Sequence, residues 1–191
     1  MKIGVLAIQG DFELHQKVLN ELNIHSLTVR KKQDLEKCDA LIIPGGESTT
    51  FVKLLKTVEL DQSIKEFGKK KAIFGTCAGL ILLSHKVSHN SVETLNLIDI
   101  EVSRNAYGRQ INSFIDIVEL KLNGMETQVE GVFIRAPKIV RIGESVHPIG
   151  YHHHDIVMAE SEHILVATFH PELTSDNQVH RYFLNKARQF I

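Results

Sequence analysis

The sequence predicts an α/β protein: a three-layer sandwich with a mostly parallel, doubly wound sheet and antiparallel strands added in its second half. Two patterns predict this fold. In the first half, short apolar runs alternate with segments whose apolar residues recur every three or four positions, as parallel strands and crossover helices do. In the second half, short apolar runs follow one another with little helix between them, which favours antiparallel pairing.

The first-half strands are expected at short apolar runs, and the helices where one face is apolar. The strands cover residues 3–8, 27–29, 40–43 and 72–74. The helices cover residues 12–22, 49–58 and 60–67 and the segment directly after Cys77. Ser48 or Thr49 is the expected N-cap of the helix at 49–58, because a hydroxyl oxygen there accepts hydrogen bonds from free backbone N–H groups.

The second-half strands are all expected to extend the main sheet. They cover residues 98–102, 114–120, 129–134, 139–142, 156–159 and 164–169, and a helix over residues 177–190 follows them. The run Tyr151-His152-His153-His154-Asp155 is expected to be an exposed turn that binds no metal, because three adjacent strand residues do not face one ion. No linker or repeat interrupts the chain, so residues 1–191 are expected to form one domain.

Composition excludes several classes of protein. Of the 191 residues 43% are apolar and 24% are charged, and the net charge is −1, so no global field favours nucleic acid or an anionic membrane. No apolar run approaches the roughly 20 residues of a membrane-spanning helix. Two cysteines are too few for a disulfide scaffold, and the first apolar run is too short for a signal peptide. These features predict a reduced, cytoplasmic protein.

The segment Gly75-Thr76-Cys77-Ala78-Gly79 carries the strongest chemical signal. It follows an apolar strand and precedes an apolar helix, as the Gly-X-Ser-X-Gly nucleophile elbow does, with cysteine in place of serine. At the N-terminus of a helix, the peptide dipoles favour the thiolate form of cysteine. Taken alone, the segment is equally consistent with a buried core cysteine.

Four unusual segments directly follow predicted strands: Gln9-Gly10, Pro44-Gly45-Gly46, Cys77 and His170. The carboxyl ends of parallel strands lie at one edge of a sheet, where ligands bind in this fold class. We therefore expect a single site at that edge.

His170 and Glu172 are the expected partners of Cys77. Two residues apart in extended backbone, they would point to the same side, so that the carboxylate orients the imidazole and the imidazole serves the thiol as base. The alternative is a turn with an exposed histidine. Ala78 and Gly46 are expected to supply the two N–H groups of an oxyanion hole, while Glu47 alone is also explained by the dipole of the helix that follows it.

Together these segments resemble a class I glutamine amidotransferase domain. The run from Ala40 to Thr50, which contains Gly45-Gly46-Glu47-Ser48-Thr49, is similar to the signature of the glutaminase subunit of pyridoxal phosphate synthase. Residues 104–110 and 131–137 agree with that family, and the similarity runs in order over almost the whole chain.

The resemblance implies a glutaminase with a Cys77-His170-Glu172 triad, which forms a glutamyl thioester and passes ammonia to a separate synthase subunit in a large hetero-oligomer. It implies no cofactor, no metal, no nucleic acid and no membrane. The residues that would hold the glutamine are Gly46, Glu47, Ser48, Arg104, Ile134 and Arg135.

Three alternatives remain open at this point. The chain could serve another synthase, such as one of the imidazole-glycerol-phosphate type. It could be a cysteine peptidase or γ-glutamyl hydrolase on a similar fold. It could also be a binding module that retains the scaffold without the activity.

Overall fold

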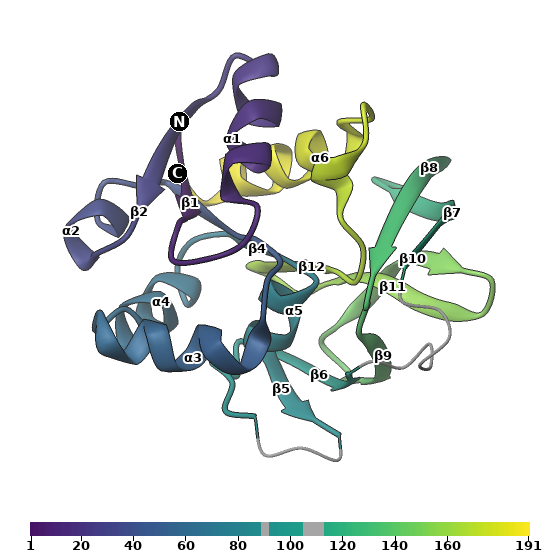
Figure 1. The fold of residues 1–191 in the computed structure, drawn as a ribbon. Coiled ribbons are helices and arrows are strands. Elements are labelled where there is room, and N and C mark those ends of the chain that lie inside the picture. The colour runs from purple at the N-terminus through teal and green to yellow at the C-terminus, as the bar shows by residue number, and fades with distance from the viewer. Residues whose placement is uncertain (89–91, 105–112) are drawn as a thin grey trace.

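The computed structural model describes residues 1–88, 92–104 and 113–191, and within them nine strands form the main sheet (Figure 1). Their order is β2-β1-β3-β4-β12-β11-β10-β7-β8. The first five pair in parallel: β2 (His25–Val29), β1 (Lys2–Leu6), β3 (Ala40–Ile43), β4 (Ile73–Thr76) and β12 (Ile164–Ala167). The others pair antiparallel: β11 (Asp155–Glu160), β10 (His147–His152), β7 (Ser113–Leu122) and β8 (Met125–Ile134). The predicted parallel sheet with antiparallel additions is confirmed.

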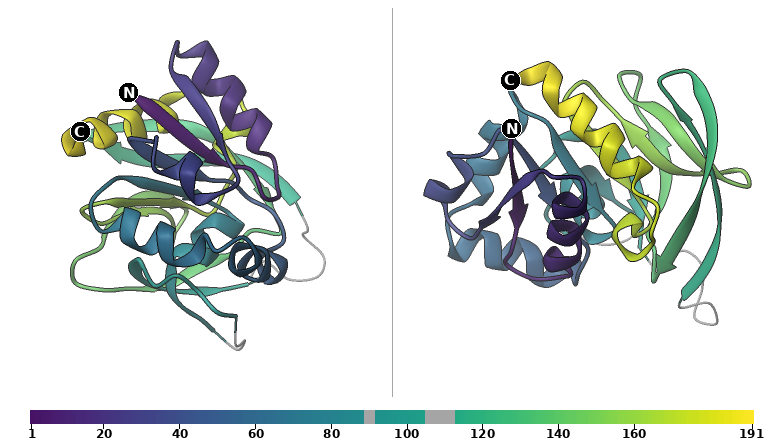
Figure 2. Two further views of the ribbon diagram at one scale, coloured as in Figure 1. Left: turned by 90° about the vertical axis from the view of Figure 1, so that its left-hand side faces the viewer. Right: turned by 90° about the horizontal axis from the view of Figure 1, so that it is seen from above.

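Helices cover both faces of the parallel part of the sheet. On one face lie α1 (Phe12–Glu21) and α6 (Gln178–Ala187), and on the other lie α3 (Ser48–Thr57), α4 (Asp61–Gly68) and α5 (Ala78–Leu83) (Figures 1 and 2). Shorter turns complete the set: α2 (Lys32–Leu35) and the 3₁₀ helices Pro171–Leu173 and Arg188–Phe190. Within the described ranges, no helix combines the length and the apolar character that crossing a membrane requires.

Two predicted strands lie outside the main sheet. The segments 98–102 and 139–142 form β6 (Ile98–Ser103) and β9 (Lys138–Ile142). With β5 (Ser84–Val87) they make a separate three-stranded sheet in the order β5-β6-β9. The expectation that every second-half strand extends the main sheet is therefore wrong. Alternating apolar residues identify a strand but not its partner, because pairing depends on residues far along the chain.

Two strands were not expected from the sequence. β5 contains a histidine and a lysine, and β10 contains a proline and a glycine, all of which obscure a strand pattern. β10 also changes register against β11 at residues 148–151. Because β10 includes Tyr151 and a buried His152, the predicted exposed turn is confined to His153 and His154.

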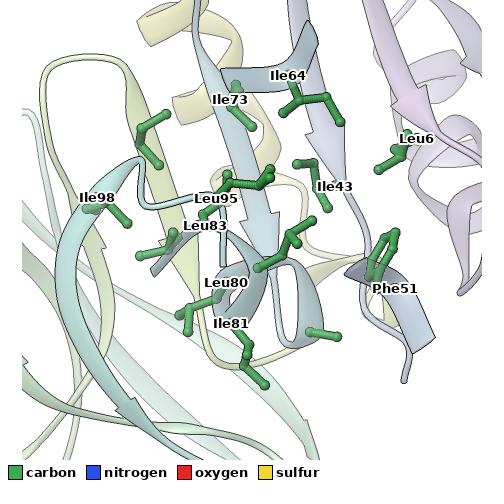
Figure 3. Close-up of a cluster of buried hydrophobic side chains, with 14 of the residues drawn as sticks. Leu6, Ile43, Phe51, Ile64, Ile73, Leu80, Ile81, Leu83, Leu95 and Ile98 are labelled. Atoms are coloured by element: carbon green, nitrogen blue, oxygen red, sulfur yellow. The ribbon is translucent and has the colours of Figure 1, made fainter. Parts of the chain in front are cut away.

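The apolar core is divided by the sheet. Figure 3 shows one part, where side chains of β3, β4, α3, α4 and α5 gather around Ile43, Ile73 and Leu80. Gly75 and Gly79 bring α5 close to the sheet: a β-carbon on Gly79 would lie 2.2 Å from the carbonyl oxygen of Ile43. The helix that follows Cys77 is therefore held at a distance from β3 that only glycine allows.

We expect Gly79→Ala to lower the free energy of unfolding by about 1–3 kcal/mol or more, because the added methyl group forces α5 away from β3. Urea unfolding measures this. Gly124→Asn is the matched control: Gly124 has φ +79, which Asn tolerates, and no atom lies within 4 Å of a β-carbon built there. Equal losses in the two variants would contradict the close approach of α5.

Candidate functional site

Cys77 forms the turn between β4 and α5. Its backbone angles are φ 49° and ψ −104°, in the left-handed half of the map that non-glycine residues rarely adopt. The surrounding structure holds it there: its N–H donates to the carbonyl of Ala167 at 2.9 Å, and its carbonyl accepts from Ile81 at 3.2 Å. Strained backbone of this kind is typical of functional sites. The predicted strand–turn–helix elbow is therefore present.

His170 and Glu172 form a buried ion pair beside the end of β12. His170 Nδ1 lies 2.7 Å from Glu172 Oε1, and both side chains are almost fully buried. The pair does not lie in extended backbone as expected, because β12 ends at Ala167 and residues 171–173 form a 3₁₀ helix. The backbone N–H of His170 donates to Val132 of β8 at 2.9 Å, which positions the pair against the antiparallel half of the sheet.

The glycine loop after β3 lies against both Cys77 and His170. A β-carbon on Gly45 would lie 2.4 Å from His170 Cε1 and 3.4 Å from the Cys77 β-carbon. The Cys77 side chain lies close enough to His170 to raise the pKa of its imidazole. A thiol, an imidazole and a carboxylate therefore follow one another in a line, with the loop packed over the imidazole.

The electrostatics of the site favour a charged His170–Glu172 pair. Burial lowers the pKa of His170, but hydrogen bonds to Cys77 and Glu172 outweigh it and raise that pKa to about 10. Burial raises the pKa of Glu172, but His15 and His170 outweigh it and lower that pKa to about 2. At neutral pH, His170 therefore holds a proton that it can give to a leaving group.

Three buried polar side chains extend the line beyond Glu172, and sequence reasoning missed all of them as site residues. His15 on α1 places its Nε2 atom 3.4 Å from Glu172 Oε2 and 3.3 Å from the hydroxyl of Thr76. Its Nδ1 atom lies 3.0 Å from Nε2 of His180 on α6. For His15 and His180, the sequence signal is a histidine at a position on the apolar face of the helix, α1 in one case and α6 in the other.

The pattern of partners assigns the tautomers of these two histidines. His180 Nδ1 and Glu172 Oε2 have no well-aligned hydrogen bond among the described residues. Suppose that His180 Nε2–H donates to His15 Nδ1. The proton of the neutral His15 ring is then on Nε2 and faces the Glu172 carboxylate. The atom left without a partner is His180 Nδ1, which in this tautomer is only an acceptor. The reverse arrangement would bury an unpaired N–H and aim a lone pair at the carboxylate, which costs more. We therefore assign His15 as a neutral imidazole whose Nε2–H faces Glu172 Oε2.

The predicted substrate-binding residues lie on segments around Cys77. The carbonyl oxygen of Ile134, at the end of β8, accepts from the Cys77 sulfur at 3.8 Å. Arg135 follows it, exposed and with φ 43°. Arg104 lies 3.9 Å from the Glu47 carboxylate. Residues 105–110 of the matching segment lie outside the described residues.

Glu47 is the N-cap of α3, so the expectation of Ser48 or Thr49 is wrong. Its carboxylate accepts from the backbone N–H groups of Thr49 at 3.0 Å and Thr50 at 2.9 Å. Hydrogen bonds from the hydroxyls of these two threonines are the main cause that lowers the pKa of Glu47 to about 2.

The residues beside Glu47 are also placed by the structure. Ser48 is buried in the first turn of α3, and Gly46 has φ 149°. The side-chain amide of Gln9 donates to the Glu47 carbonyl at 2.7 Å. The segment after β1 therefore contacts the glycine loop, as expected if both lie at the same edge of the sheet.

A family model described as the SNO glutamine amidotransferase family matches residues 5–189. The chain belongs to this family. It is 46% identical over 190 residues to the pyridoxal 5'-phosphate synthase subunit PdxT of Thermosipho africanus, covering 99% of this chain and 100% of that one. It is 44% identical over 191 residues to the subunit of the same name from Brevibacillus brevis, covering 100% and 99%.

Solved structures agree with this membership. A crystal structure of a glutamine amidotransferase superposes with a TM-score of 0.91 at 40% identity, covering 97% of this chain and 98% of that chain. A glutamine amidotransferase from Thermotoga maritima shares the fold at a TM-score of 0.64 and 13% identity, covering 99% of this chain and 83% of that chain.

We expect His15 and His180 to make the protein sensitive to acid. Burial lowers the pKa of both, that of His180 to about 3, so below about pH 6.5 the unfolded chain binds protons that the folded chain cannot. The free energy of unfolding should therefore fall as the pH drops through this range. In urea titrations from about pH 7 to about pH 5, His180→Gln should make this slope shallower.

His25→Gln is the control, because His25 is exposed on β2 and its removal should leave the slope unchanged. A slope as steep in His180→Gln as in the unmodified chain would contradict the neutral, buried state of His180.

Proposed function

We propose that the chain is a glutaminase that hydrolyses L-glutamine to L-glutamate and ammonia through a thioester on Cys77. We propose further that it supplies the ammonia to the synthase subunit of pyridoxal 5'-phosphate synthase within a large hetero-oligomer. The observation that carries the proposal is the strained Cys77 elbow beside the buried His170–Glu172 pair in a member of the glutamine amidotransferase family. Full-length relatives with the synthase-subunit name favour this function over a peptidase or a different synthase.

The first half-reaction follows from the placement of the charges. The Cys77 thiolate attacks the carbonyl carbon of the glutamine side chain and forms a tetrahedral oxyanion. His170 gives its proton to the departing nitrogen, the C–N bond breaks, and ammonia leaves a glutamyl thioester behind. Glu172 holds the imidazole and stabilises its positive charge throughout.

The second half-reaction returns the enzyme to its starting state. His170, now neutral, takes a proton from water, and the resulting hydroxide attacks the thioester carbon. The C–S bond then breaks, glutamate leaves, and the Cys77 thiolate is restored beside the protonated His170. This chemistry uses groups of the protein and one water molecule, and we propose that it requires no cofactor and no metal.

Backbone N–H groups on both sides of Cys77 would stabilise the oxyanion. Ala78 opens α5, and the first N–H groups of a helix have no partner within it. Gly46 would supply the second N–H, because its neighbour Gly45 already lies against His170 and Cys77. Two donors at that position are the arrangement that acyl transfer requires.

The substrate presents an α-carboxylate and an α-ammonium beyond the amide. We propose that Arg104 and Arg135 serve the carboxylate, and that Ile134, Gly46, Glu47 and Ser48 line the remaining contacts. The Ile134 carbonyl supports this assignment because it lies beside the Cys77 sulfur, where it can accept from a substrate N–H. Glu47 already caps α3, so it would act on the ammonium through charge at longer range.

We also propose that residues 1–191 act as one glutaminase domain in the cytoplasm. Both cysteines are unpaired, which suits a reducing compartment. Their surroundings differ. Burial raises the pKa of Cys38 to about 11, so that thiol stays protonated. Cys77 instead has an imidazole, that of His170, beside it.

We expect Cys77→Ala to abolish glutamate release from L-glutamine, because no second nucleophile is placed to replace the thiol. The assay uses the purified chain by itself and mixed with its synthase partner. Cys38→Ala is the matched control and should retain activity. Glu172→Ala should cost less than Cys77→Ala, because the orienting member of a triad can matter less than the nucleophile. Activity in Cys77→Ala, or none in the folded, reduced chain with its partner, would overturn the proposal.

We expect His15→Leu to lower kcat by roughly ten- to hundredfold while KM stays within about twofold, because Glu172 loses a donor and the triad loses its alignment. His15 is a positioning residue and does not touch substrate. His15→Gln should recover part of the loss, since its amide can donate toward Glu172. Equal activity in the two variants would show that the residue acts only by filling space.

A further inference from the structure

A second cluster of titratable side chains lies outside the triad and its extension to His15 and His180. It consists of Asp116 on β7, His152 at the end of β10 and His153 in the turn to β11. One donor atom from each residue lies within 4.8 Å of the other two. The proposed glutaminase chemistry uses none of them.

Strand register explains why Asp116 and His152 meet. β7 and β10 are antiparallel, with Tyr151 opposite Glu119, so the same register places His152 opposite Val118. Asp116 lies two residues before Val118 on β7, so its side chain points to the same face of the sheet as those of Val118 and His152. The distance from His152 Nε2 to Asp116 Oδ2 is 3.0 Å.

The turn explains how a second, adjacent histidine reaches the same carboxylate. In a continuing strand His152 and His153 would point to opposite faces. His153 instead has φ 52°, and its Nε2 atom lies 3.9 Å from Asp116 Oδ2. The left-handed turn thus brings two neighbouring imidazoles to one side of the sheet.

Of the three side chains in the cluster, one is fixed by packing and the other two are accessible to solvent. The buried ring of His152 packs on Phe114 and Phe133, with ring centroids 5.4 and 5.3 Å away. The side chains of Asp116 and His153 are 48% and 77% exposed, so an ion has a path from solvent.

We propose that Asp116, His152 and His153 bind a divalent transition-metal ion, preferably Zn²⁺, through two imidazole nitrogens and one carboxylate oxygen. A tetrahedral Zn²⁺ about 2.1 Å from each ligand holds the ligand atoms about 3.4 Å apart, and the observed separations of 3.0 and 3.9 Å lie on either side of that value. Water completes the fourth position. Two imidazoles favour Zn²⁺ or Ni²⁺ over Mg²⁺ and Ca²⁺, which prefer oxygen ligands.

Metal binding would move the proton of the neutral His152 ring from one nitrogen to the other. Its Nε2–H now donates to Asp116, whereas a ligating Nε2 must offer a lone pair, so the neutral ring carries its proton on Nδ1 when the ion is bound. The ion then replaces one hydrogen bond with three coordinate bonds. Because it links β7 to the β10–β11 turn, it should stabilise the folded state.

The test is a calorimetric titration of the chain with ZnCl₂, in parallel with MgCl₂. The chain is purified without a histidine tag and carries Cys77→Ala, which removes the catalytic thiol as a competing ligand. We expect saturable binding of one Zn²⁺ per chain, a rise in Tm with Zn²⁺, and neither effect with Mg²⁺.

Variants then locate the ion. His153→Ala and Asp116→Asn should each weaken Zn²⁺ binding by about tenfold or more. His154→Ala, the exposed neighbour in the same turn, should leave it unchanged. Because His153 is exposed, its removal leaves the fold intact. The absence of saturable binding, equal binding in His153→Ala, or an equal loss in His154→Ala would each overturn the proposal.

Discussion

The backbone conformation of Cys77 is the constraint on which the site depends. One residue with a positive φ turns the chain from β4 into α5, and this turn is possible only because the residues around it are small. A β-carbon on Gly75 would lie 2.8 Å from the backbone of Gly79, and one on Gly79 would meet Ile43. Close packing of α5 on the sheet thus compensates the strain and aims the sulfur at His170.

A buried polar chain gives the site its second support. Five buried polar residues form this chain, and each would be costly to bury alone. Four lie in separate elements and the fifth directly precedes the 3₁₀ helix: Thr76, His15, Glu172, His180 and His170. Together they partner one another, so the contacts that hold α1, β4, the 3₁₀ helix and α6 in place also orient the proposed triad. The stability of the fold and the geometry of the site therefore share one set of interactions, with two neutral imidazoles behind one charged pair.

The antiparallel half of the sheet completes the site and adds a feature of its own. β8 places the Ile134 carbonyl beside Cys77 and the Val132 carbonyl beside His170, so the parallel half of the sheet alone would leave both residues without these contacts. Along the same strands, the rings of Phe114 and Phe133 stack with centroids 4.5 Å apart and pack against His152. One sheet thus positions two groups of chemically active side chains.

Local patterns in the sequence determined the elements that need only near neighbours. The strand–turn–helix at Cys77 and the glycine loop depend on backbone preferences within a few residues, and these the sequence predicts. His170 and Glu172 were expected to meet through extended backbone, whereas a 3₁₀ helix brings their side chains together. Tertiary structure alone decided which strands form the small sheet. It also brought His15 to His180, which are 165 residues apart, and Asp116 to His152. Such pairs depend on how distant elements pack, and no periodicity within a single segment encodes that.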